Sequence, residues 1–239
     1  MRVNVPIYLP TWAYKTLRHL RYGARNVPSN GLTLSGDRDI EWSFVVSRMP
    51  AGSGEALDFG ASFGRLSISA AQKGYHVLAL DLDPEQFQWK HPNVDFLCGD
   101  LLTVDLPTRH FDLILNCSSV EHVGLQGRYG VAVEETDGDL QAMQRFLVLM
   151  KPSGRMLLTI PCGRDAAIVP WHRVYGEQRL PRLLSSYAIE EEAFWMKHED
   201  NRWYPSCRKE ALSFVPTGHP TMPTLCSYAL GCFVLKAVA

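Results

Sequence analysis

The sequence predicts an α/β protein whose sheet is mostly parallel and is covered by helices on both faces. Short apolar segments with strand character alternate with segments in which apolar residues recur at helical spacing. The strand segments are almost continuously apolar, which is typical of strands buried on both faces of a parallel sheet. We therefore expect a three-layer sandwich, with the sheet between two layers of helices.

Seven strands and three helices are expected in this sheet and its cover. The strands are residues 56–59, 76–80, 94–97, 111–116, 156–160, 187–196 and 228–238. The helices are residues 39–49, 64–73 and 140–150. Lys151-Pro152-Ser153-Gly154 is expected to end the last helix, because proline and glycine interrupt helical structure.

The composition is that of an ordinary globular chain of 239 residues, with 46% hydrophobic and 21% charged residues. Such a chain can build one sizeable core, which excludes disorder, collagen and small disulfide scaffolds. We expect a single domain over residues 1–239. It would consist of a helical extension over 1–50, a ligand-binding core over 51–196, and terminal strands with a loop over 197–239.

Charge, hydropathy and cysteine content argue against binding to nucleic acid, against a membrane span and against an oxidising compartment. The formal net charge is −1, so the whole chain is not an electrostatic binder of nucleic acid. No apolar run reaches the roughly 18 residues that span a bilayer, and the N-terminus lacks the apolar run of a signal peptide. The six cysteines form no C-x-x-C pair, which favours free thiols in a reducing cytoplasm. Residues 1–36 are basic, and we expect a short helix over 13–20 with a solvated basic face. The alternative is a contact surface for an acidic substrate or partner.

A glycine turn, Gly60-Ala61-Ser62-Phe63-Gly64, follows the first predicted strand. Its two glycines let the backbone turn sharply and approach a ligand closely. In an open parallel sheet, ligands bind at the carboxyl ends of the strands, where this turn lies. The turn fits a dinucleotide fingerprint poorly, because Ser62 and Arg65 stand where the second and third glycines belong.

The same five residues also match the G-x-S-x-G turn of serine hydrolases. Ser62 would be the nucleophile, and Asp112 and His172 follow it in the required order. In those hydrolases, however, the turn follows a strand deep in the sheet rather than the first strand. A serine hydrolase is therefore kept as an alternative.

Acidic residues recur at the ends of successive strands, and together with the glycine turn they resemble a known family. Asp58 and the turn resemble the first motif of class I, Rossmann-like, S-adenosylmethionine-dependent methyltransferases, with Ser62 in place of the middle glycine. Asp81, Gly99-Asp100-Leu101, 116–123 and 151–155 resemble the motifs that follow, in the same order. The resemblance covers roughly residues 50–196. It implies S-adenosylmethionine as the cofactor and a last strand that runs antiparallel.

The resemblance also assigns the methionine and ribose parts of the cofactor to particular residues. Gly60, Ser62 and Gly64 would pass close to the methionine part, and Asp58 would favour its ammonium group. Asp81 would accept hydrogen bonds from both ribose hydroxyls, because a carboxylate has two acceptor oxygens.

The remaining cofactor residues are expected around the adenine and at the end of the fourth strand. Leu82 would lie against the adenine, Asp100 would accept from its amino group, and the Leu101 amide would donate to the ring. Asn116 completes the expected set.

A hydroxyl acceptor needs a base, and His122 is the first candidate because it follows the fourth strand and has an ordinary pKa near 6.5. His172 is the second candidate, and a structural role is the alternative for each. Related ubiquinone-biosynthesis O-methyltransferases carry a glutamate where Ser118 stands, so we expect no metal. Asp137 and Asp139 are expected to cap the helix that follows them, with a site for a hard cation as the alternative.

The expected reaction is O-methylation of a hydroxyl on a sugar or a small natural product. Three loops with polar and aromatic residues would bind this small-molecule acceptor: 124–138, 161–175, and the segment with Trp203 and Tyr204. A non-catalytic S-adenosylmethionine-binding partner protein is a second alternative. The sequence is also compatible with a homo-oligomer.

Overall fold

The computed structural model describes residues 37–85, 87–126, 129, 134–198, 202–218 and 226–238. The chain divides into two units, Met1–Thr33 and Leu34–Ala239, and every described element belongs to the second. The basic segment and the short helix expected over 13–20 lie outside the described residues.

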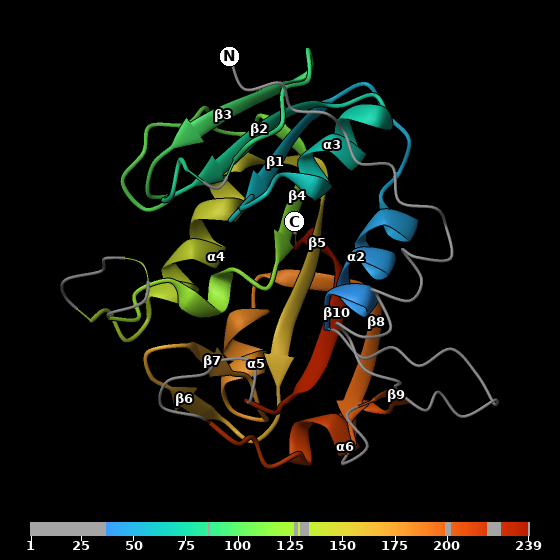
Figure 1. Cartoon of the computed structure of the whole chain (residues 1–239), viewed down its shortest axis with the longest axis vertical. Helices are drawn as coiled ribbons and strands as arrows, with labels where there is room; N and C mark the ends of the chain where they lie inside the picture. Colours follow the sequence, from blue (N-terminus) through green and yellow to red (C-terminus); the bar gives the residue numbers. More distant parts are fainter. Residues whose placement is uncertain are drawn as a thin grey trace, which may run out of the picture. The chain divides into compact units, whose positions relative to one another are not determined.

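The main sheet has eight strands in the order β3-β2-β1-β4-β5-β10-β8-β9 (Figure 1). They are β1 (Glu55–Phe59), β2 (His76–Asp81), β3 (Val94–Cys98), β4 (Phe111–Cys117), β5 (Met150–Cys162), β8 (Tyr187–Lys197), β9 (Trp203–Ser206) and β10 (Ala229–Ala237). The first five strands in this order, from β3 through β2, β1 and β4 to β5, pair in parallel. Strand β10 runs antiparallel between β5 and β8. The mostly parallel, Rossmann-like sheet with an antiparallel last strand is confirmed.

The expected count of seven strands is wrong by one, because β9 adds an edge strand beside β8. This strand has four residues and contains Pro205, which removes one backbone donor. A proline normally argues against a strand, but it is tolerated at a sheet edge, where β9 lies. Two short strands, β6 (Ala166–Ile168) and β7 (His172–Val174), form a separate hairpin that the sequence did not predict.

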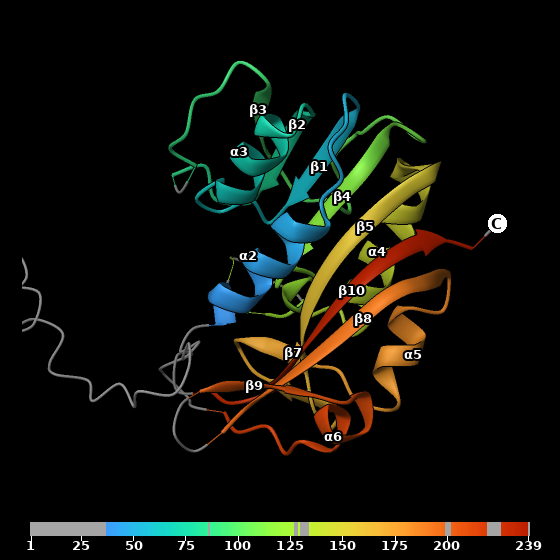
Figure 2. The ribbon, with the colours of Figure 1, turned by 90° about the vertical axis from the view of Figure 1, so that its right-hand side faces the viewer.

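Helices cover both faces of the sheet, as the three-layer expectation requires. They are α2 (Asp37–Arg48), α3 (Arg65–Gln72), α4 (Gly138–Leu149), α5 (Arg179–Leu183), α6 (Arg208–Ser213) and the 3₁₀ turn η1 (Val120–His122). In Figure 2, α2 and α3 lie on one side of the sheet and α4 and α5 on the other. Along β4, Leu113 and Leu115 pack with the first pair and Ile114 with the second, because successive strand residues face opposite sides.

The register of the parallel strands aligns their carboxyl ends at one edge. Phe59, the last residue of β1, pairs with Leu80 on β2 and with Asn116 on β4. The segments that follow these three strands therefore meet at the same edge of the sheet.

The segment between α4 and the sheet differs from the expected turn. Helix α4 ends at Leu149, and β5 already begins at Met150 rather than near residue 156. The pairing with β4 shifts between Phe111 and Leu113, so residues 151–154 form a bulge. Gly154 permits it, because a Cβ there would lie 3.0 Å from the carbonyl oxygen of Phe111 and closer still to Met150.

Buried ion pairs hold the start of α4 against α5 and β7. Asp139 is fully buried and accepts hydrogen bonds from Arg179 Nε at 2.9 Å and from the Tyr175 hydroxyl at 3.0 Å. Arg173 Nε lies 3.8 Å from the same carboxylate. Neither Asp137 nor Asp139 caps the helix as expected, because Asp137 makes no capping bond and Asp139 pairs with arginines.

Arg173 also closes the base of the segment between η1 and α4. Its guanidinium is almost fully buried and donates to four backbone carbonyls. These belong to Glu121, Val123, Glu135 and Thr136. One side chain therefore fixes both ends of residues 124–135.

Among the described residues, no helix has the length and apolar character needed to cross a membrane. All six cysteines are free thiols. Cys162, Cys226 and Cys232 are buried, whereas Cys98 and Cys207 are exposed.

Replacing Asp139 by Ala should lower the free energy of unfolding by about 3–5 kcal/mol, because it leaves buried arginine charge unpaired. Asp137→Ala is the matched control, since the Asp137 side chain is about half exposed, at 46%, and its ion pairs with Arg179 and Arg182 are worth less than about 1 kcal/mol. Urea denaturation measures both values. Equal losses in the two variants would contradict the importance of the buried pair.

Candidate functional site

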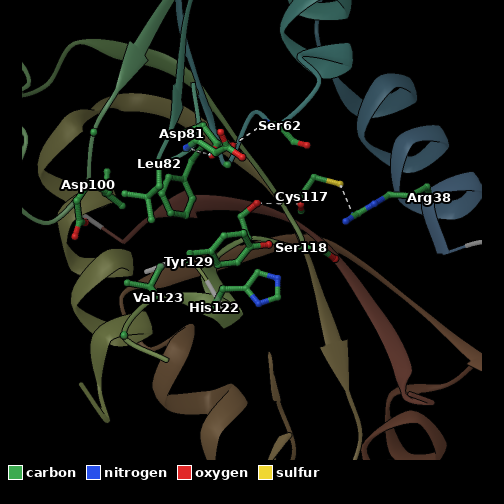
Figure 3. Close-up of a pocket in the computed structure, with 17 residues that line it drawn as sticks. Arg38, Ser62, Asp81, Leu82, Asp100, Cys117, Ser118, His122, Val123 and Tyr129 are labelled. Atoms are coloured by element: carbon green, nitrogen blue, oxygen red, sulfur yellow. Dashed lines mark hydrogen bonds between the residues drawn. The ribbon is translucent and has the colours of Figure 1, made fainter. Parts of the chain in front are cut away.

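A cavity of about 480 Å³ opens at the edge where the strand ends meet (Figure 3). Its walls come from the ends of β1 to β4, from the segment around η1, and from α2. The volume lies in the range of small-molecule sites. Six of the nine expected cofactor residues line it: Gly60, Ser62, Asp81, Leu82, Asp100 and Leu101.

The glycine turn is bound directly to the end of β2. Gly60 and Ser62 have φ angles of 67° and 44°, so the backbone turns back on itself. The Ser62 amide donates to Asp81 Oδ2 at 2.7 Å. A Cβ on Gly60 would overlap the Ser119 side chain, so glycine is required at this close approach.

Asp81 keeps acceptor capacity toward the cavity. Its second oxygen, Oδ1, accepts from the Asp83 amide at 3.0 Å. Each carboxylate oxygen has two lone-pair sites, and one amide on each oxygen leaves the others for hydroxyl donors. The two amides also hold the carboxylate in one orientation.

Asp100 and Leu101 form the opposite end of the cavity from Arg38, as Figure 3 shows for Asp100. Asp100 Oδ1 accepts from the Leu102 amide at 2.9 Å, and its carbonyl accepts from the Val104 amide at 2.8 Å. This turn exposes the Asp100 side chain and buries that of Leu101.

His122 lines the cavity with a defined ring orientation. Its Nδ1 lies 2.5 Å from the carbonyl oxygen of Trp171, which can only accept. Nδ1 therefore carries a hydrogen, and Nε2 lies 3.8 Å from Oε1 of the buried Glu121. The ring of Tyr129 meets His122 edge-on at 5.3 Å between centroids. His122 thus lies on the cavity wall with one ring nitrogen facing a carbonyl and the other facing a carboxylate.

His172, the second candidate base, does not line the cavity. It is 5% exposed, and its ring centroid lies 6.4 Å from that of His122 and 5.1 Å from that of Tyr228. It packs behind His122 rather than beside a bound molecule.

Helix α2 supplies a charged wall that the sequence analysis missed. Arg38 lines the cavity, and its Nη1 lies 2.5 Å from Glu41 Oε2. Burial acts to lower the pKa of Arg38, but the carboxylate of Glu41 and the neighbouring Cys117 raise it above its ordinary value. The available signal was the i, i+3 spacing of Arg38 and Glu41 on the helix that precedes the glycine turn.

Comparison with known proteins gives the family of this site. A model of the family described as "Methyltransferase domain" matches residues 56–134, which include the glycine turn, the strand-end acids and His122. This match supports a class I S-adenosylmethionine-dependent methyltransferase. A second family, described as "Caenorhabditis protein of unknown function, DUF268", matches residues 101–202.

The chain is also similar to known methyltransferases in sequence and in fold. The Demethylmenaquinone methyltransferase of Tropheryma whipplei is 26% identical over 190 residues, 72% of this chain and 70% of the relative. The N-methyltransferase NodS of Bradyrhizobium japonicum has a TM-score of 0.53 at 16% identity, over 86% of this chain and 100% of that one. A TehB-like methyltransferase of Corynebacterium glutamicum has a TM-score of 0.50 at 18% identity, over 95% and 96% of the two chains. The two structural similarities show the shared fold.

Three of the expected cofactor residues do not reach the cavity of the methyltransferase. Asp58 is 2% exposed and accepts from the Ser67 hydroxyl at 2.5 Å. Asn116 is fully buried, and its Oδ1 accepts from the Val120 amide at 3.1 Å. Gly64 precedes α3 with a φ of 72°, where a Cβ would meet the ring of Phe87. These residues shape the turns beneath the cavity.

The serine hydrolase alternative is wrong on the same geometry. Ser62 follows the carboxyl end of β1, whereas Asp112 is the second residue of the parallel strand β4 and lies at the opposite edge. Asp112 accepts there from Lys151 Nζ at 2.7 Å and from the Glu55 amide at 2.9 Å. No Ser-His-Asp arrangement of these three residues is formed.

Within the described ranges, no group of three His, Cys, Asp or Glu side chains lies close enough together to hold a metal ion.

Asp58 should make the stability of the methyltransferase depend on pH. Burial raises the pKa of its carboxyl to about 6, and the Ser67 bonds oppose this. The folded state then keeps a proton that the unfolded chain releases near pH 4, so this stabilisation is present below about pH 4 and is lost as the pH rises through 6. Asp58→Asn should therefore gain stability relative to the wild type over this range, by at most about 3 kcal/mol.

Urea denaturation of both proteins between pH 4.5 and 7.5 measures the difference. A difference that stays constant over this range would contradict the raised pKa.

Proposed function

We propose that this methyltransferase transfers the methyl group of S-adenosylmethionine to a hydroxyl of a sugar or small natural product, with His122 as the base. The observation that carries the proposal is the orientation of His122 on the cavity wall, with Nδ1 bound to the Trp171 carbonyl. Six free cysteines support a reducing cytoplasm as its location.

The residues of the cavity fit the cofactor along its length. Asp100, Leu101 and Leu82 would hold the adenine, and the two oxygens of Asp81 would accept from the ribose hydroxyls. Arg38, at the far end of the cavity, would bind the methionine carboxylate, because guanidinium groups pair strongly with carboxylates.

The methionine part between these ends would pass the turn at Gly60. Asp58 lies below that turn without lining the cavity, so it would favour the ammonium group through its charge rather than by contact.

When bound, the cofactor supplies an electrophilic methyl carbon. His122 Nε2 would accept the proton of the hydroxyl as the oxygen–methyl bond forms and the sulfur–methyl bond breaks. The Trp171 carbonyl would then stabilise the protonated ring through Nδ1–H. The wall around His122 would hold the hydroxyl in line with the methyl group. No step in this scheme assigns a role to a metal.

A quinone is a second candidate acceptor. The observation that favours it is the similarity to the Tropheryma relative, whose name gives demethylmenaquinone as its substrate. Incubation with methyl-labelled cofactor and separate panels of polyols, phenols and demethylmenaquinone would distinguish the two. Cofactor binding without turnover on every panel would instead support the non-catalytic partner protein.

The proposed cofactor orientation predicts which ligands lose affinity when a residue at each end of the cavity is replaced. Asp81→Ala should weaken both S-adenosylhomocysteine and 5′-methylthioadenosine by about 1–3 kcal/mol, because both carry the ribose. Arg38→Ala should weaken only S-adenosylhomocysteine, because 5′-methylthioadenosine lacks the amino-acid part. Calorimetry measures the affinities, and Asp95→Ala, exposed on β3, is the matched control. Unchanged affinity in Asp81→Ala would refute the ribose assignment.

Replacing His122 by Ala should lower kcat by about a hundredfold to ten-thousandfold on the acceptor found in the panels, because a base contributes about that much. The affinity for S-adenosylhomocysteine should barely change. His172→Ala should cost less than about tenfold, since His172 does not line the cavity. A larger loss of kcat in His172→Ala than in His122→Ala would assign the base to His172.

A further inference from the structure

The first turn of α2 brings Arg38 to one end of the cavity, as Figure 3 shows. An arginine side chain has many rotamers, so a ligand that binds it must order it unless the protein already does so. The first turn of a helix is also its least constrained part, because its backbone N–H groups lack partners within the helix. What holds Arg38 in place therefore decides how well it can receive a ligand.

Tyr228, which directly precedes β10, holds the backbone of Arg38 through Asp37. The Tyr228 hydroxyl donates to Asp37 Oδ2 at 2.8 Å, and Asp37 Oδ1 accepts from the Arg38 amide at 2.8 Å. Burial raises the pKa of Tyr228 well above its ordinary value, so the hydroxyl keeps the hydrogen of this bond. The Tyr228 ring contacts those of His172 and Trp203, with centroids 5.1 and 5.9 Å away. The start of α2 is thus tied to a packed side chain.

Glu41 holds the guanidinium of Arg38 separately. It is fully buried, and its Oε2 accepts from Arg38 Nη1 at 2.5 Å. Its Oε1 accepts from the hydroxyls of Ser118 and Thr159, which fix the carboxylate in turn. Arg38 Nη1 also lies 3.8 Å from Cys117 Sγ. Toward the rest of the described chain, Nε and Nη2 of Arg38 make no hydrogen bond, so these donors remain for a ligand.

We propose that Tyr228 and Asp37 position Arg38 for the methionine carboxylate, so that the site selects a methyl donor that carries this carboxylate. Both are positioning residues, since neither lines the cavity. Without the Tyr228 hydroxyl, the first turn of α2 would be free to shift, and the guanidinium would have to be ordered on binding. The inference rests on the proposed function, in which Arg38 binds the carboxylate.

The test compares two ligands that differ only in the carboxylate. Decarboxylated S-adenosylmethionine keeps the adenine, the ribose, the sulfonium and the amine of the cofactor. The preference, defined as the Kd for this ligand divided by the Kd for S-adenosylmethionine, should be about tenfold or more in the wild type, because hydrogen bonds between charged groups are strong. Calorimetry at pH 7.5 without an acceptor measures both constants.

Tyr228→Phe removes the hydroxyl and keeps the ring. It should reduce the preference about threefold to tenfold, by weakening S-adenosylmethionine and leaving the decarboxylated ligand unchanged. Asp37→Ala should reduce it at least as much, and adding Tyr228→Phe to that variant should change nothing further, because the two residues act through one bond. Tyr187→Phe is the matched control and should keep the preference. The Tyr187 hydroxyl donates to the Met143 carbonyl at 2.7 Å on α4, across the sheet from α2 (Figure 2).

Two results would overturn the positioning role while Arg38→Ala abolishes the preference as expected. One is a preference that Tyr228→Phe and Asp37→Ala leave unchanged. The other is a loss of preference in Tyr187→Phe as large as that in Tyr228→Phe, which would make the effect a general consequence of losing a tyrosine hydroxyl. A wild type without any preference, or an Arg38→Ala variant that keeps it, would instead refute the proposed placement of the carboxylate, and the positioning role with it.

Discussion

Parallel pairing of β1 with both β2 and β4 is the constraint on which the site depends. Because the three strands run in one direction and in register, their last residues lie side by side. The backbone that leaves each strand must then turn within a small volume. The hydrogen bond from the Ser62 amide to Asp81 joins two of these turns and gives the cavity a rigid floor.

The sequence was sufficient for the parallel core of the sheet and for the residues that directly follow its strands, but not for the edge strand β9. The ends of apolar runs locate Gly60, Asp81 and Asp100 at one edge, and the structure lines the cavity with all three. Asp58 and Asn116 lie inside strands, where the direction of a side chain depends on the pleat. The order of residues alone did not reveal that these two point away from the cavity.

Contacts between distant segments account for the rest of what the sequence did not reveal. Arg38 reaches the cavity because α2 packs against the sheet. Glu41 on the same helix bonds Ser118, 77 residues further along the chain. Local periodicity predicts that such a helix exists and which face is apolar, but not which end of the sheet its charged residues meet. The orientation of the His122 ring depends in the same way on Trp171, 49 residues away.

The guanidinium of Arg173 anchors the two ends of one segment independently of what lies between them. It holds the carbonyls of Val123 and Glu135, so both ends of residues 124–135 are attached to β7. An insertion or deletion between these ends would leave the same guanidinium holding the backbone that follows η1. The length of the segment can therefore vary among homologues without displacing the backbone that carries His122.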